Sequence, residues 1–353
     1  MKGLKPMRMG NPWSGTKASR WRVTARIAGA WVAWTVVAGG MLLAPMARAQ
    51  TAATDPQAIR DAVRQQLKAE DIGHGFETLG VFGGTPDASA ARYDSDKITL
   101  HGYKLPITHS FRDKDDTDGV APYLEVTLGY ENAWQETALA TGDTPSDAGQ
   151  VKQSYKSYSA LGGFGLDIPV GPSTTIRPVA LGGYTRIRGS GEFSGADADL
   201  LRESTGGILT SMRIDSFLAG GGVEVQHDRA LPDDLRLHLM GRFSEFADIP
   251  NRVSDPSLET TGSFGFATVN AQLDGPLGHL FADDLRWIAF SRGNILIGAQ
   301  QAFLGFDKFL EVGGGLEVVT PHIGYGVEGV TLRGSAIVGN GVRGWTVGLG
   351  LAF

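Results

Sequence analysis

The feature that most constrains the fold is a long series of segments in which apolar and polar residues alternate. In one of them, Leu124, Val126 and Leu128 alternate with Glu125 and Thr127, so that one face of an extended strand is apolar and the other polar. Most of the segments exceed the ~5–6 residues of a soluble strand and reach the ~9–11 with which a tilted strand crosses a bilayer. Twelve such segments lie near residues 75–83, 97–111, 121–133, 151–168, 174–188, 208–226, 234–246, 262–274, 286–300, 307–320, 325–338 and 342–353.

Length decides between the two folds that such alternation allows. A soluble β-sandwich also alternates, but its strands are short. Among structures built from strands, only a closed barrel can cross lipid without leaving backbone groups unpaired. The connections near residues 134–150, 189–207 and 247–261 are long and polar, whereas the one at 169–173 is compact, as expected when alternate connections face opposite sides of a membrane. We therefore predict an all-β fold, a transmembrane antiparallel β-barrel of about 12 strands, with ten or fourteen strands as alternatives.

The first 49 residues are predicted to be a signal peptide. They hold eight basic residues and no acidic one, and the first acid of the chain is Asp55. The apolar run 27–44 is followed by Ala47, Arg48 and Ala49, the small-x-small pattern of a cleavage site, which predicts a cut before Gln50. The alternative is an uncleaved anchor helix, because about 18 apolar residues can just span a bilayer.

Composition excludes several classes of function. The chain has 353 residues with 38 acids and 32 bases, and loss of the signal peptide leaves 24 bases, a formal charge of -14. That charge opposes binding to nucleic acid. With no cysteine, the chain has neither disulfides nor thiolate metal sites nor thiol catalysis. We predict no cofactor and no resident metal.

A short helix is predicted between the signal peptide and the strands. Asp55 caps it, and Ile59, Val63 and Leu67 recur at four-residue spacing before the helix ends near Gly73. The helix lies either on a periplasmic stub or inside the barrel lumen. The predicted organisation is a signal peptide at 1–49, a helical segment at 50–73 and an outer-membrane barrel at 74–353.

The last strand carries a pattern typical of bacterial outer-membrane proteins. Thr346, Gly348, Leu351 and the terminal Phe353 match polar-x-Gly-x-x-hydrophobic-x-aromatic, which the barrel-assembly machinery reads in that class of proteins. A strand added edge to edge is a physical basis for that recognition.

A helix followed by about twelve strands and this ending resembles the translocator of autotransporters. Only Gln50 to Thr54 would precede the helix after cleavage, too few for a passenger. The chain thus resembles the solitary outer-membrane autotransporter-type β-barrel family over residues 55–353. The resemblance implies a monomer in the bacterial outer membrane, in contact with its lipids, the export machinery and the barrel-assembly machinery. Beyond the four signal positions, it carries over no functional residue.

Charged residues at polar positions of the strands are the candidates for a lumen network. They are Arg186, Arg188, Arg236, His238, Arg242, Glu125, Glu311 and Glu317. Either they neutralise one another and fill a closed lumen, which we favour, or they form an ion-selective constriction.

Three motifs that could indicate a functional site also have simple structural explanations. The G-x-G-x-x-G at residues 339–344 is interpreted as a strand hairpin around Asn-Gly, because no helix follows it. The acidic run 113–119 is interpreted as a solvated turn, since a lysine stands where a calcium loop needs its first carboxylate. His101, His109 and His238 would have to supply the base of a hydrolase, but no nucleophile is placed beside them by spacing alone.

We therefore predict a non-enzymatic barrel with a structural or translocator-like function. The alternatives are a narrow channel for small polar solutes or ions and, after that, an outer-membrane hydrolase.

Overall fold

The computed structural model describes most of the chain after the predicted signal peptide, which itself lies outside the described residues. The described residues are 56–80, 87–112, 119–139, 149–195, 198–259, 262–280, 283–298, 301–320 and 329–352. Their elements are α1 (Pro56–Glu70), α2 (Ile72–Gly80), β1 (Ala88–Ser95), β2 (Thr99–Ser110), β3 (Ala121–Leu139), β4 (Gly149–Gly171), β5 (Thr174–Ser194), α3 (Ala198–Thr205), β6 (Met212–Ala230), β7 (Arg236–Val253), the 3-10 helix η3 (Pro256–Leu258), β8 (Gly262–Leu280), β9 (Asp283–Ile297), α4 (Gln301–Leu304), β10 (Lys308–Val319), β11 (Gly329–Gly339) and β12 (Val342–Ala352).

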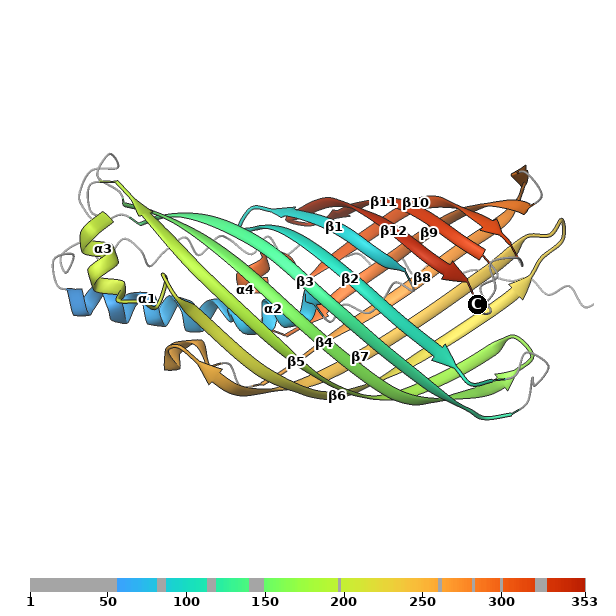
Figure 1. Ribbon diagram of the computed structural model, residues 1–353, viewed down its shortest axis with the longest axis horizontal. Coiled ribbons are helices and arrows are strands. Elements are labelled where there is room, and N and C mark those ends of the chain that lie inside the picture. Colours follow the sequence, from blue (N-terminus) through green and yellow to red (C-terminus); the bar gives the residue numbers. More distant parts are fainter. Residues whose placement is uncertain are drawn as a thin grey trace, which may run out of the picture. The chain divides into compact units, whose positions relative to one another are not determined.

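Within these residues, twelve antiparallel strands close into one barrel (Figure 1). Each strand pairs with its neighbours in sequence, and β12 pairs with β1 over eight residues, from Ala88 opposite Leu349 to Ser95 opposite Val342. Closure gives every strand a hydrogen-bonded neighbour on both sides, as a barrel in lipid requires. The predicted fold class is confirmed, with twelve strands.

The outer wall is apolar where the sequence alternates. On β12, Trp345 is 48% exposed and Leu349 is 55% exposed, while Gly348 and Gly350, on either side of Leu349, are buried on the inner face. Leu124, Val126 and Leu128 on β3 are likewise exposed. An apolar surface of this extent is unfavourable in water. The outer wall is therefore expected to contact the hydrocarbon of a membrane.

The first predicted strand is wrong. Residues 72–80 form the helix α2, and the first strand is β1, which the sequence did not predict. Every residue from Ile72 to Leu79 is buried, His74 and Glu77 included, so α2 lacks the exposed polar face from which a surface helix is recognised in a sequence. On β1 the outward residues include Ala88, Ala90 and Arg92, which are too small or too polar to give an apolar alternation.

The barrel has two unlike ends. At one, which we call the helical end, the connections after β5, β7 and β9 carry α3, η3 and α4. At the other, the terminal end, β1 begins and β12 ends, and the connections after β4 and β8 have two residues each. The long connections predicted after β3, β5 and β7 all lie at the helical end.

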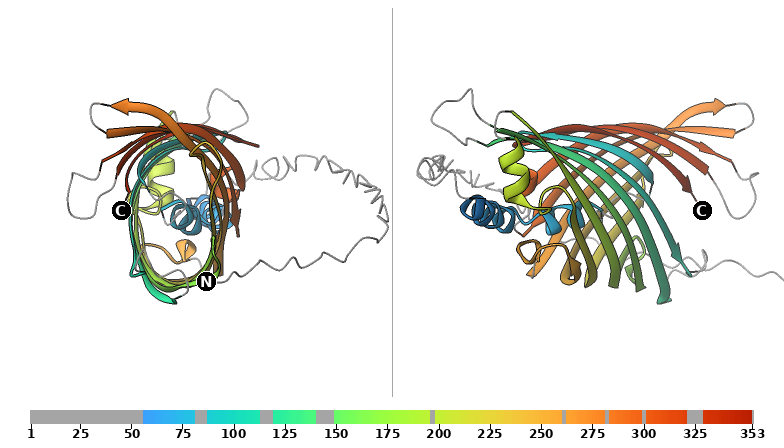
Figure 2. Two further views of the ribbon diagram at one scale, coloured as in Figure 1. Left: turned by 90° about the vertical axis from the view of Figure 1, so that its right-hand side faces the viewer. Right: turned by 60° about the vertical axis from the view of Figure 1, so that its left-hand side comes forward.

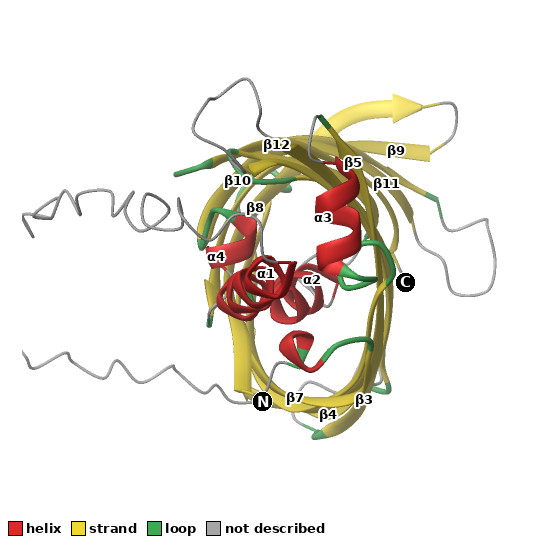
Figure 3. Cartoon of the chain, turned by 90° about the vertical axis from the view of Figure 1, so that its left-hand side faces the viewer, coloured by secondary structure: helices red, strands yellow, loops and turns green. Residues whose placement is uncertain are grey.

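Two consecutive helices occupy the helical end and the lumen (Figures 2 and 3). Helix α1 packs against α3, η3 and α4, and α2 continues inward, where it packs against the inner faces of β2, β3, β4, β5 and β8. Asp71 separates the helices with a positive φ of 51°, a conformation that aspartate tolerates better than most residues. None of the helices in the described ranges is both long and apolar enough to cross a membrane.

The apolar core of the protein fills the helical half of the lumen. The ring of Phe76 on α2 lies 5.4 Å from that of Tyr155 on β4 and 5.2 Å from that of Phe303 on α4, measured between ring centroids. Phe246 and Phe264 stack on the opposite wall, where Phe264 also contacts the ring of His74. A helix as short as α2 is only marginally stable by itself in water. The burial of these apolar side chains therefore stabilises α2 more than its intrinsic helix propensity does.

Candidate functional site in the barrel lumen

Six of the eight predicted lumen residues lie on inward faces of the strands. They are Glu125, Arg236, His238, Arg242, Glu311 and Glu317. They lie beyond the apolar core, toward the terminal end of the barrel. In that half of the barrel each strand turns its polar face toward the lumen.

Several ion pairs in this network cross the lumen between strands that are not neighbours. Arg242 on β7 bonds to both carboxylate oxygens of Glu125 on β3, at 2.6 and 2.9 Å. Arg236 on β7 reaches Glu317 on β10 at 2.7 Å. Since β7 pairs only with β6 and β8, these bonds bridge the interior and narrow it.

The network continues around the wall with few unpaired charges. Glu224 accepts bonds from Arg177 at 2.7 Å and from Arg242 at 3.4 Å. His238 lies between Asp228, at 2.7 Å, and Asp274, at 3.1 Å. Together they line a polar cavity of 510 Å³ in the terminal half of the lumen. The arrangement fits mutual neutralisation better than a constriction with a net charge.

The prediction that Arg186 and Arg188 face the lumen is wrong. Thr185 and Ile187 point inward and are buried, so the two arginines lie on the outer wall near the helical end, where both contact Asp215. In this half the alternation is inverted: the inside is an apolar core and the outside carries charge. Along one strand, the inward-facing residues thus change from polar at the terminal end to apolar at the helical end.

Side chains at the mouth tether α1 to the helical end. The Arg64 guanidinium donates two bonds to Asp255, beside η3, at 2.9 and 3.2 Å, and Arg60 donates to the carbonyl of Ser204 on α3 at 2.9 Å. Burial alone would raise the pKa of Asp255, but the hydrogen bonds from Arg64 and Ser257 outweigh it and hold that pKa below its usual value.

A buried polar cluster on α2 was missed by the sequence reasoning. His74 and Glu77 on α2 and Asp248 on β7 each bring a side-chain nitrogen or oxygen within 4.8 Å of the others. The Glu77 carboxylate accepts a bond from Thr185 at 2.9 Å. A His-x-x-Glu spacing on a helix would have indicated a shared face, but this segment was interpreted as a strand.

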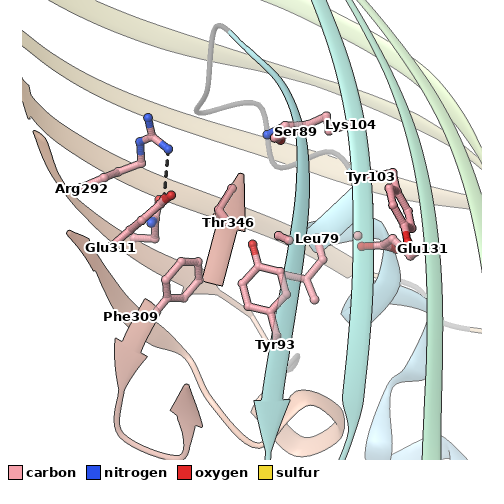
Figure 4. A pocket seen from close by; sticks show the side chains of 13 residues that line it. Leu79, Ser89, Tyr93, Tyr103, Lys104, Glu131, Arg292, Phe309, Glu311 and Thr346 are labelled. Carbon is pink, nitrogen blue, oxygen red and sulfur yellow. Dashed lines mark hydrogen bonds and ion pairs between the residues drawn. The ribbon is translucent and has the colours of Figure 1, made fainter. Parts of the chain in front are cut away.

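A small cavity of 50 Å³ lies at the inner tip of α2 (Figure 4). Leu79 and Tyr93 border it, and the ion pair of Arg292 with Glu311, at 3.0 Å, stands on one side. It has room for a few water molecules but not for a solute passing through.

Three of the four predicted assembly-signal residues lie on β12, and Phe353 lies outside the described residues. Thr346 and Gly348 are on the inward face and Leu351 is on the outward face, 55% exposed. His101 and His109, considered above as hydrolase bases, lie on the outward face of β2, in register with outward residues of β3.

The closed wall, its apolar belt and its polar lumen define a transmembrane β-barrel of the bacterial outer membrane. Among solved structures, the chain is similar to the transport unit of the autotransporter AIDA-I from Escherichia coli, with 9% identity over 84% of this chain and 99% of that one, and a TM-score of 0.47. It is also similar to the β-domain of the Bordetella autotransporter BrkA, with 12% identity over 75% and 97% of the two chains and a TM-score of 0.44. The translocator domain of NalP from Neisseria meningitidis gives 14% identity over 85% and 98%, and a TM-score of 0.42.

These similarities are to translocator barrels, as the sequence resemblance predicted, and they concern the fold. No protein-family model matches the chain, and no curated protein matches it by sequence.

Proposed function

We propose that this protein is a non-enzymatic, translocator-like barrel whose own N-terminal segment passes through the lumen and closes it. One observation carries the proposal. Helix α1 packs against α3, η3 and α4 at the helical end, whereas β1 begins at the terminal end. Between them α2 runs inward into the lumen, which is the path expected of a segment that was drawn through the barrel from the terminal end.

The lengths of the connections support an orientation for this path. Outer-membrane barrels keep their short turns in the periplasm and their long loops outside. The two-residue connections after β4 and β8 then lie in the periplasm, and α3 and α4 lie at the cell surface. With that orientation α1 is on the outside, so the residues that follow the signal peptide have crossed the membrane.

The proposed partners follow from the same orientation. The exposed apolar side chains on the wall suit the lipids of the outer membrane. The strand β12, which carries Thr346, Gly348 and Leu351, is the edge that we propose the barrel-assembly machinery recognises before β12 pairs with β1. The export machinery would read residues 1–49.

Site-directed labelling tests the crossing, because the chain has no cysteine of its own. Ala62 is exposed on α1, and Ser173 lies in the turn between β4 and β5. In intact cells, a maleimide too large to pass through porins should label Ala62→Cys and should not label Ser173→Cys.

Lysed cells provide the control, since both variants should then react. Labelling of Ser173→Cys but not Ala62→Cys in intact cells would place α1 in the periplasm and refute the crossing.

A narrow channel is the second candidate, and the 510 Å³ polar cavity is the observation in its favour. The cross-lumen pairs of Arg242 with Glu125 and of Arg236 with Glu317, together with the apolar core around Phe76, argue for a closed lumen in the full chain. Conductance in planar bilayers distinguishes the two, because a channel conducts with α1 and α2 in place.

A further inference from the structure

The cluster around His74 has the composition and spacing of a metal site. His74 and Glu77 are three residues apart on α2 and therefore share a face. That face meets Asp248 on β7, and the three side chains are buried, with 4%, 0% and 6% of each residue exposed. Imidazole nitrogen and carboxylate oxygen are both donors that bind zinc and other divalent ions of the first transition row.

The orientation of the imidazole leaves a lone pair free for a cation. His74 Nδ1 bonds to the Asp71 carboxylate at 2.7 Å, so in the neutral ring that a metal requires Nδ1 carries the proton and Nε2 is the free nitrogen. Nε2 has no hydrogen-bond partner, and it lies 3.8 Å from Asp248 Oδ2, too far for a hydrogen bond. A carboxylate behind the ring is the usual outer partner of a metal-binding histidine.

Glu77 also turns an oxygen into the cluster. Its Oε1 accepts the bond from Thr185, while Oε2 is fully buried and makes no hydrogen bond of ordinary geometry, with the Ser216 hydroxyl as a further polar group acting on the carboxylate. Two side chains that are more than nine-tenths buried, His74 and Glu77, thus each keep one atom without an ordinary hydrogen bond in a cluster whose ligand atoms lie within 4.8 Å of one another. Leaving such atoms unsatisfied is costly in a protein interior.

The cluster brings several carboxylates together in the protein interior. Asp71, Glu77 and Asp248 contribute three carboxylates. The groups that act most strongly on Glu77 are Asp248, His74 and two hydroxyls, and those that act on His74 are these carboxylates. No lysine or arginine is among them. Buried carboxylates are stable only when they are protonated or paired with a cation. The carboxylates of this cluster must therefore hold either protons or a metal ion.

We propose that His74 Nε2, Glu77 Oε2 and an oxygen of Asp248 bind a divalent metal ion of the zinc class. The ion would join α2 to β7 and so fix the helix in the lumen. Asp71 would position the imidazole without touching the metal. The site is independent of the direction in which the N-terminal segment crosses the membrane, so it goes beyond the proposed function.

Metal content of the folded protein tests the site. The full chain, extracted in detergent and stripped with a chelator, should take up about one zinc ion per molecule from added zinc chloride, measured by mass spectrometry of the metal after desalting. Glu77→Gln, which keeps the shape of the side chain, and His74→Ala should both lose that ion. Asp71→Asn should weaken zinc binding by roughly 10–100-fold, the usual cost of losing an outer partner.

His238→Ala is the matched control, because His238 also lies between two carboxylates but has Arg236 beside them. It should retain the zinc. Heat-modifiable mobility on a gel shows that each variant is a folded barrel before its metal is counted.

A competing arrangement fills the cluster with protons instead of a metal. Folded full chain that takes up no zinc would establish that arrangement and overturn the proposal. Equal zinc uptake by the full chain and by folded Glu77→Gln would overturn it as well.

Discussion

At the scale of single residues, the plug is held by a few charged contacts whose strength depends on protonation. Asp255 is the clearest case, because it is largely buried beside η3 and accepts both bonds from Arg64 on α1. Its carboxylate form is therefore more stable in the folded protein than in the unfolded chain. The contribution is present above the usual pKa of an aspartate and is lost as the pH falls through the lowered folded value.

Replacing Asp255 should free α1 at neutral pH and have no effect in strong acid. A spin label on Ala62→Cys should be more mobile in Asp255→Asn than in the parent near about pH 7, because the ion pair with Arg64 is missing. As the pH is lowered through the folded pKa of Asp255, the parent should become as mobile as the variant, since its own carboxylate is then protonated.

Asp61→Asn is the control for this prediction, because Asp61 is the other carboxylate near Arg64 but is exposed and 3.6 Å away. It should change the mobility little, as expected for a surface ion pair. A difference between Asp255→Asn and the parent that persists in acid would mean that the side chain acts by packing and not by charge.

At the scale of elements, the sequence predicted eleven of the twelve strands and missed what lies inside them. Strands such as β3 and β10 follow one rule along their outer faces, because lipid contacts them, and their alternation is visible without a structure. Helix α2 obeys no such rule: the wall surrounds it, so its side chains are buried whether they are apolar, as Phe76 is, or polar, as His74 and Glu77 are. The residues that surround α2, such as Phe303 on α4, come from distant parts of the sequence, so a local pattern cannot identify them.

The misplaced arginines have the same origin. Along β5, the outward positions pass from Ala180 to Tyr184 and then to Arg186, while the inward positions pass from Arg177 to Ile187. Polarity changes faces because the lumen is wet at the terminal end and filled with apolar side chains at the helical end. A single alternation rule cannot be right at both ends of one strand.

Helix α2 should tolerate no side chain at Gly75. A Cβ there would overlap the ring of Phe303, and the helix is packed too tightly to move aside. Gly75→Val should cost about 1–3 kcal/mol of the free energy that keeps α2 in place. That cost corresponds to a rise of roughly 5–150-fold in the open population, which limited proteolysis of residues 56–80 would detect.

Two further variants identify the contact as the cause. Gly241→Val places the same side chain in open space on β7 and should leave α2 as resistant to protease as in the parent. Adding Phe303→Ala to Gly75→Val should restore part of the resistance. Equal sensitivity of the single and double variants would show that the helix is loosened for a reason other than this overlap.

At the scale of the whole barrel, the wall and the plug are separate structures. Every strand is hydrogen-bonded to two other strands in the closed ring. The backbone hydrogen bonds that close the wall therefore do not involve α1 or α2. The lumen is closed twice, by the apolar core at the helical end and by the cross-lumen pairs beyond it. The sequence predicted the second closure through residues such as Glu125 and Arg242, but not the first.

Removing residues 56–80 should leave a folded barrel and open a path for ions. The helices fill the helical half, and without them Phe303 and Tyr155 would border a water-filled space that continues into the 510 Å³ cavity. The full chain should give no steady conductance in planar bilayers, and the shortened chain should give discrete steps, provided that its gel mobility still changes on heating. A shortened chain that is folded but does not conduct would mean that the ion pair of Arg242 with Glu125 and its neighbours seal the lumen by themselves, and the helices would then be anchors rather than the plug.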